Sequence, residues 1–149
     1  MIKSLIAALA LSTLCIPQVE ASTYTEQDLL NTFKDMGGRY YIDSEICDRY
    51  KGIFGAHQRG VIHLCTQPHG RDVAEWNDTI RHEVWHVVQM CNEGPITKNA
   101  VSMIDTARRN GWKPENYPPS AWHKEAEAHY VAATRSAEEI RNGLIKACS

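Results

Sequence analysis

Residues 72–92 read DVAEWNDTIRHEVWHVVQMCN, and their spacing predicts the helix around which the fold is organised. Asp72 is a favourable N-cap residue, with Glu75 three positions later as its capping-box partner. Apolar side chains recur every three or four positions and form one stripe for the core, at Trp76, Ile80, Val84, Val87 and Cys91. Gly94 and Pro95 end the helix. The segment therefore predicts an amphipathic helix with one buried face.

The other face of this helix carries His82-Glu83-Val84-Trp85-His86, which is the HExxH arrangement. His82 and His86 are one turn apart, so both imidazoles can bind one ion. Zn²⁺ held in this way lowers the pKa of its bound water toward about 7. Glu83 stands beside the first histidine, where its carboxylate can take the proton of that water and return it to the leaving amine. The motif predicts His82 and His86 as ligands and Glu83 as the general base.

Catalytic zinc usually takes three protein ligands and leaves one position for water, so a further ligand is needed. Residues 122–130, WHKEAEAHY, lie on a later predicted helix and offer His123, Glu125, Glu127 and His129. Glu125 and Glu127 are two positions apart and point to nearly opposite faces, so only one of them can face the ion. The small alanines beside them would let this helix approach the metal helix closely. The residues by themselves leave the choice open.

The HExxH motif followed much later by Glu127-Ala128 resembles the gluzincin branch of the zincin metallopeptidases, which includes the thermolysin-like enzymes. In that branch the third ligand is a Glu on a downstream helix, often followed by Ala. The resemblance implies that Glu127 completes the zinc site with His82 and His86. It also implies a small antiparallel sheet before the metal helix, whose edge strand holds extended substrate by backbone pairing. Residues 61–65 are the best candidate for that strand.

The resemblance covers the two helical motifs and the order of elements rather than the whole chain. Gln89 and Asn92 stand where the metzincin branch would need a Gly and a third His. Two interpretations of Gln89 stay open, because its side chain could orient His86 by a hydrogen bond or simply be exposed. The chain is also too short for the separate C-terminal helical domain of thermolysin-like enzymes.

This difference in size means that the resemblance does not supply the group that polarises the scissile carbonyl. We expect Tyr130, one turn beyond Glu127, to have this catalytic role, although packing in the core is its alternative. His123, His129 and Tyr117 compete with it for the same role.

Residues 1–21 have the pattern of a secretory signal peptide. Lys3 gives a positive start, residues 5–16 form a short apolar run, and cleavage is expected after Ala21. The apolar run is well short of the roughly 20 residues that a membrane-spanning helix needs. We therefore expect residues 22–149 to form a single metallopeptidase domain that is secreted or periplasmic, with no membrane partner after cleavage.

Four cysteines follow the leader, and an even number in an exported chain predicts two disulfides. Three pairings are possible. We favour Cys47 with Cys65 and Cys91 with Cys148, because each pair then closes a separate part of the fold. A structural zinc site made of these cysteines is disfavoured, since none of them is paired as C-x-x-C.

The remaining segments predict an α+β fold, with a small sheet packed on the HExxH helix and further helices around it. Helical spacing is seen at residues 25–36, at 97–110, and from 120 toward 147, with a break near Ser136 or Gly143. Residues 39–46, 52–57 and 61–65 have the composition of strands.

Together these observations predict a zinc-dependent metallopeptidase that acts on protein or peptide substrates as a monomer. The net charge of −2 gives no electrostatic argument for a nucleic-acid partner. One alternative is a non-catalytic metal-binding or interaction module that keeps a zincin fold, and another is a disulfide-held domain whose histidines bind nothing. The intact Glu83 favours the enzyme, because a pure metal site needs no base beside its ligands.

Overall fold

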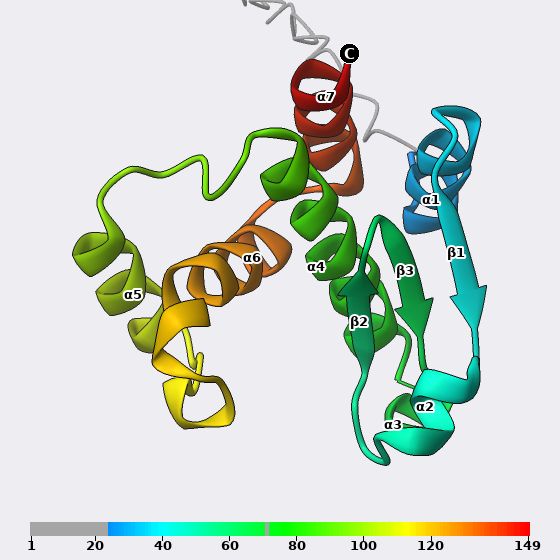
Figure 1. Ribbon diagram of the computed structural model, residues 1–149, viewed down its shortest axis with the longest axis horizontal. Coiled ribbons are helices and arrows are strands. Elements are labelled where there is room, and N and C mark those ends of the chain that lie inside the picture. The colour runs from blue at the N-terminus through cyan, green and yellow to red at the C-terminus, as the bar shows by residue number, and fades with distance from the viewer. Residues whose placement is uncertain (1–23, 71) are drawn as a thin grey trace, which may run out of the picture.

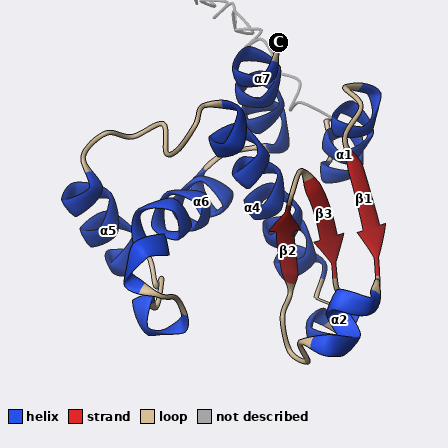
Figure 2. Cartoon of the chain, viewed as in Figure 1, coloured by secondary structure: helices blue, strands red, loops and turns tan. Residues whose placement is uncertain are grey.

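The computed structural model describes residues 24–70 and 72–149, so the predicted signal peptide lies outside the described residues. The elements follow one another as α1 (Glu26–Asp35), β1 (Arg39–Ile42), α2 (Glu45–Arg49), β2 (Gly55–Gln58), β3 (Val61–Leu64), α3 (Thr66–His69), α4 (Val73–Cys91), α5 (Ala100–Arg109), η1 (Pro114–Asn116), η2 (Pro119–Ala121), α6 (Trp122–Thr134) and α7 (Ala137–Cys148). The long helix α4 runs between the sheet and the pair α5 and α6 (Figure 1). The predicted α+β class is confirmed, with all strands on one side of α4 (Figure 2). Within the described ranges, no helix combines the length and the hydropathy that crossing a bilayer requires.

The three strands form one sheet in the order β1-β3-β2. β2 and β3 are antiparallel and joined by a tight turn at Arg59 and Gly60, both of which have a positive φ. β1 runs parallel to β3, so the expectation of an antiparallel sheet is wrong. The reason is that the chain passes through α2 and β2 before β3 returns beside β1.

The position of β3 in the sheet also corrects the expected substrate strand. β3 is the central strand, and its Ile62 and Leu64 are fully buried. It therefore cannot offer a free edge to a peptide. The edge strand beside α4 is β2, which pairs with β3 on one side only (Figure 1).

α4 begins after Asp72 as predicted, but the capping box is only half formed, because the backbone N–H of Asp72 donates to the carbonyl of His69 rather than to Glu75. The side chain of Asp72 accepts a hydrogen bond from the backbone N–H of Glu75 at 3.0 Å, which caps the helix. Of the predicted apolar stripe, Ile80, Val84 and Val87 are buried, whereas Trp76 and Cys91 are partly buried. The stripe packs against apolar residues of α1, β3 and α7, namely Leu29, Leu30, Phe33, Ile62, Leu64, Ile140 and Leu144. α4 is thus held by the main core on one face and leaves its other face for the site.

A second, smaller core joins α5 to α6 through Met103, Ala107, Trp112 and Ala126. The last predicted helical region is broken at Ser136, which caps α7. The alanines that flank Glu127, Ala126 and Ala128, are both fully buried, as their small size suggested. This second core sets how α6 is rotated against α4.

Both favoured disulfides are present. Cys47–Cys65 joins α2 to the residue after β3, and Cys91–Cys148 joins the ends of α4 and α7. Two disulfides are typical of a protein from an oxidising, extracellular-type environment.

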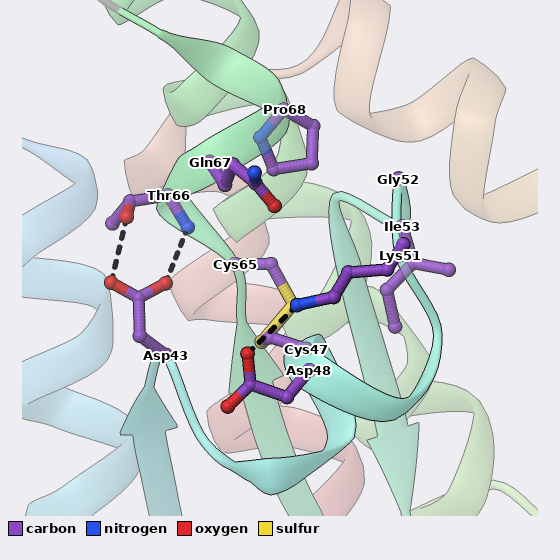
Figure 3. Close-up of a pocket in the computed structure, with 10 residues that line it drawn as sticks. All are labelled: Asp43, Cys47, Asp48, Lys51, Gly52, Ile53, Cys65, Thr66, Gln67 and Pro68. Atoms are coloured by element: carbon purple, nitrogen blue, oxygen red, sulfur yellow. Dashed lines mark hydrogen bonds and ion pairs between the residues drawn. A yellow bond between two sulfur atoms is a disulfide. The ribbon is translucent and has the colours of Figure 1, made fainter.

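The strand predicted over residues 39–46 ends early, at Ile42. Asp43 has a positive φ, and its carboxylate accepts hydrogen bonds from the backbone N–H (2.8 Å) and the hydroxyl (2.7 Å) of Thr66 (Figure 3). This turn redirects the chain into the short helix α2, where Cys47 meets Cys65. The same corner starts the segment that leads toward β2.

Candidate metal centre

α4 and α6 bring together two imidazoles and one carboxylate. His82 and His86 have ring centroids 4.6 Å apart, with the rings nearly perpendicular. The Nε2 atoms of His82 and His86 lie 3.4 Å and 3.2 Å from the same oxygen of Glu125. The three ligand atoms all lie within 4.8 Å of one another. This is the group among the described residues that could hold a metal ion.

The two nitrogen–oxygen separations of this group suit a tetrahedral ion. Ligand atoms about 2.1 Å from a tetrahedral zinc ion lie about 3.4 Å from one another. The two nitrogen–oxygen distances, 3.4 Å and 3.2 Å, are close to this value. Burial would raise the pKa of Glu125, but its hydrogen bonds with His82 and His86 outweigh burial and hold that pKa below the usual range. The site therefore presents an ionised carboxylate between two imidazoles, and two imidazoles with one carboxylate are a donor set of catalytic zinc sites.

Glu127, the third ligand implied by the resemblance, does not lie with the histidines, and this prediction is corrected to Glu125. Glu127 is 1% exposed. Its carboxylate accepts hydrogen bonds from Trp85 Nε1 (3.1 Å), Gln89 Nε2 (2.8 Å), Ile96 N (3.1 Å) and Thr97 N (2.6 Å). Burial would raise the pKa of Glu127, but the hydrogen bonds from Gln89, Thr97 and Trp85 outweigh burial and lower that pKa. Because α6 turns Glu125 toward His82 and His86, the residue two positions later must point to nearly the opposite side of the helix.

Gln89 lies between this buried carboxylate and the metal centre. Its side chain is 1% exposed, so simple exposure is excluded. Gln89 Oε1 lies 2.8 Å from Nδ1 of His86, which is the orienting hydrogen bond that the sequence left open. The Nε2 atom of His86 is thereby left to face Glu125.

Glu83 occupies a buried position beside these residues. It is 5% exposed, and its Oε2 atom has no hydrogen-bond partner among the described residues. Burial raises the pKa of Glu83 to about 7. The backbone of β2 passes directly against it, since a Cβ atom on Gly55 would lie 2.7 Å from Glu83 Oε1. Gly55 is therefore a residue of the site that motif analysis missed, because only the folded chain shows this close approach.

A cavity of about 490 Å³ opens beside His82 and Glu83. Residues 52–55 form one wall, and Asn116, Tyr117 and His129 are on the side of α6. Burial raises the pKa of Tyr117 to about 12, and the nearby charges of Glu125 and Glu83 act in the same direction. The Tyr117 hydroxyl thus keeps its proton at neutral pH and can donate a hydrogen bond into the cavity. We call this cavity the cleft.

Tyr130, for which a catalytic role was expected, does not line the cleft. It packs against the second core and lines another cavity, of about 460 Å³, together with Trp85 and Glu127. Tyr130 follows Glu127 by three positions, so it shares the buried face of α6 rather than the face of Glu125. Of its competitors, Tyr117 and His129 line the cleft, and His123 is in neither the metal group nor the cleft lining.

A third cavity, of about 240 Å³, lies at the disulfide corner (Figure 3). Its charged groups are paired within the cavity, because Thr66 holds Asp43 and Lys51 lies 3.0 Å from Asp48. Gly52 and Ile53 line both this cavity and the cleft. The disulfide corner therefore supports one wall of the cleft.

Comparison with known proteins gives a family but no function. A family model described as "Domain of unknown function (DUF8637)" matches residues 16–149. Neither the curated proteins nor the solved structures hold a significant match to the chain. Its function is therefore inferred from the residues of the site.

Proposed function

The chain belongs to the DUF8637 family, and because that description carries no activity, we propose from its site that it is a secreted zinc metallopeptidase. One observation carries the proposal. His82 and His86 each lie within hydrogen-bond range of one oxygen of Glu125, close to the separation of tetrahedral zinc ligands, and the buried Glu83 stands beside them in the lining of a cleft. A metal-binding module would need the three ligands, but it would have no use for Glu83 in that position.

The residues of the cleft divide the chemistry of peptide hydrolysis between them. A bound zinc ion would polarise the scissile carbonyl and make a water molecule more acidic. Glu83, with one carboxylate oxygen that has no partner among the residues the structure describes, takes the proton of the attacking water and passes it to the leaving amine. Tyr117 donates a hydrogen bond to the carbonyl oxygen as negative charge develops there.

The fold proposed for this enzyme is zincin-like, with one change from the resemblance. The ligand from the downstream helix is Glu125 rather than Glu127. β2 takes the place of residues 61–65 as the strand that holds substrate, because it is the edge strand and its Gly55 contacts Glu83. An extended peptide paired with this edge would lie along the cleft.

Two features support export of the enzyme. The N-terminal leader has the pattern of a signal peptide, and both disulfides close within the described residues. Disulfides of this kind persist in secreted and periplasmic proteins. We therefore place the active protein outside the cytoplasm.

The variant Glu83→Gln tests the proposal. It keeps the three ligands and removes the base, so we expect unchanged zinc affinity and at least about a hundredfold loss of peptide hydrolysis. Hydrolysis of a peptide library is measured with and without a chelator, and zinc binding by native mass spectrometry.

Glu138→Gln is the matched control, because Glu138 is an exposed glutamate on α7. It should leave both zinc binding and hydrolysis unchanged. Hydrolysis that survives chelation would contradict the proposed mechanism. Zinc binding without hydrolysis by the wild-type chain would instead favour the metal-binding module.

A further inference from the structure

We infer that Glu127 is a positioning residue for His86 and that it acts through the side-chain amide of Gln89. The starting point is an unbroken chain of contacts between the metal centre and the protein interior. Nδ1 of His86 is 2.8 Å from Oε1 of Gln89, and Nε2 of Gln89 is 2.8 Å from Oε2 of Glu127. Gln89 and Glu127 are each 1% exposed, so water does not compete for these bonds.

The donor and acceptor roles along these contacts are fixed at their buried end, Glu127. Glu127 receives hydrogen bonds from three N–H groups besides Gln89, those of Trp85, Ile96 and Thr97. The same oxygen that contacts Gln89 accepts the N–H groups of Trp85 and Ile96, so it acts as an acceptor. Glu127 therefore requires a donor from Gln89.

The orientation of the Gln89 amide then determines which ring nitrogen of His86 carries the proton. Its nitrogen faces two acceptors, Glu127 Oε2 and the backbone carbonyl of Lys124 at 2.9 Å. Its oxygen must then face His86, and because a carbonyl oxygen only accepts, Nδ1 of His86 must carry a proton. The lone pair of the neutral ring is left on Nε2, which faces Glu125 at 3.2 Å. Glu127, together with the carbonyl of Lys124, thus selects the tautomer of His86 that can bind a metal ion.

This inference rests on the proposed metal role of His86. It assigns to Glu127, which the resemblance implied as a ligand, the role of orienting a ligand at the same site. A purely structural role is the competing explanation, since Glu127 also holds the backbone of Ile96 and Thr97 against α6. The two roles differ in whether the effect of Glu127 on zinc passes through Gln89.

A double-mutant cycle on the full-length mature chain separates them. Zinc Kd is measured by competition with a chelator for the wild type, Glu127→Gln, Gln89→Met and the double variant, with Glu138→Gln as the control. Glu127→Gln should weaken zinc binding about tenfold in the wild-type background. In the Gln89→Met background the same change should have less than about a twofold effect, because the connection is already cut.

The outcomes are distinct. Zinc affinity that is unchanged in Glu127→Gln, or weakened equally in both backgrounds, would overturn the positioning role. The wild-type Kd is read first, and a wild-type chain that binds no zinc would overturn the metal site and this inference with it. A tenfold loss of zinc affinity in the wild-type background that is absent in the Gln89→Met background supports the inference.

A measurement on the wild-type chain covers the case in which Glu127→Gln does not fold. Both hydrogens of the Gln89 amide are used in bonds to buried acceptors. In NMR spectra of the zinc-loaded protein they should exchange with solvent at least about tenfold more slowly than those of the exposed Gln67. The Nδ1 proton of His86 should be observed as well. Fast exchange of the Gln89 amide would show that the connection is absent.

Discussion

The two faces of α6 carry the same kind of residue in opposite situations. On the face toward His82 and His86, Glu125 lies between two imidazoles and can accept a metal ion with them. On the buried face, Glu127 has four N–H donors around its carboxylate. Two tyrosines differ in a related way, because Tyr117 lines the cleft and Tyr130 lines the cavity beside Glu127, although both pack against the second core.

This comparison shows how a site residue is distinguished from a structural one. A buried carboxylate whose hydrogen bonds are complete gains little from a ligand, because binding would break bonds it already has. A carboxylate that faces nitrogen atoms able to hold a metal has more to gain. The number of carboxylates in the motif is thus less informative than what each of them already contacts.

The largest expected effect comes from removing the carboxylate charge on each face of α6 in turn. Glu125→Gln removes one of three ligands, so zinc affinity should fall more than about a hundredfold. That loss exceeds the one typical of residues that only hydrogen-bond to a ligand. Its free energy of unfolding without metal should change by about 1 kcal/mol or less, since the amide oxygen can still accept a hydrogen bond. Glu127→Gln should instead lose about 2–4 kcal/mol, because buried N–H groups lose their acceptor. Urea unfolding of the metal-free variants and zinc titration measure the two quantities.

The comparison would fail if these effects were reversed. A Glu127→Gln variant that loses zinc while Glu125→Gln keeps it would restore Glu127 as the ligand. Equal losses of both quantities in both variants would mean that the two faces of α6 are not separate in function.

The two tyrosines give the next largest effect. Tyr117→Phe removes the hydroxyl that faces the cleft, and kcat should fall up to about a hundredfold, as for loss of one oxyanion donor. Zinc affinity should not change, because Tyr117 is not in the metal group. Steady-state kinetics on the best peptide of the library measures kcat and KM separately.

Tyr130→Phe is the matched control for this pair. Tyr130 lines the cavity beside Glu127 rather than the cleft, so its hydroxyl should be dispensable for hydrolysis. A fall in kcat for Tyr130→Phe with none for Tyr117→Phe would return the catalytic role to Tyr130.

Local features of the sequence predicted a good part of the fold. The capped helix after Asp72, its apolar stripe and the break at Ser136 follow from periodicity and capping, which act over a few residues. The disulfides were within reach because four cysteines allow only three pairings. His82 and His86 meet because helical geometry alone places them one turn apart.

The features that were missed depend on tertiary packing. The choice between Glu125 and Glu127 requires the rotation of α6, which is set by a core that includes Met103 and Trp112. Nothing in the motif reports that rotation. In the same way, the direction of β1 and the contact of Gly55 with Glu83 arise between segments that are distant in sequence. Short strands carry too little pattern to specify their partners.

The smallest effect should come from two glycines, one on each side of the comparison. A Cβ atom on Gly55 would approach Glu83 Oε1 to 2.7 Å, so Gly55→Ala must move the base or the strand. A displacement of a few tenths of an ångström should lower kcat about tenfold, since a misplacement of about 1 Å can cost a hundredfold. Zinc affinity should stay the same, because the ligands are not touched. Kinetics and zinc titration of the same preparation measure this.

Gly143→Ala is the counterpart on the buried side. Its Cβ would lie 3.0 Å from the ring of Trp85, which donates a hydrogen bond to Glu127. Alanine favours the helix by about 1 kcal/mol, which offsets only part of the cost of the tight contact. The melting temperature should therefore fall slightly, without a change in kcat. If Gly143→Ala lowered kcat as much as Gly55→Ala, a change in packing on the buried side would displace Glu83 as well. The division of α6 into a structural and a chemical face would then have to be abandoned.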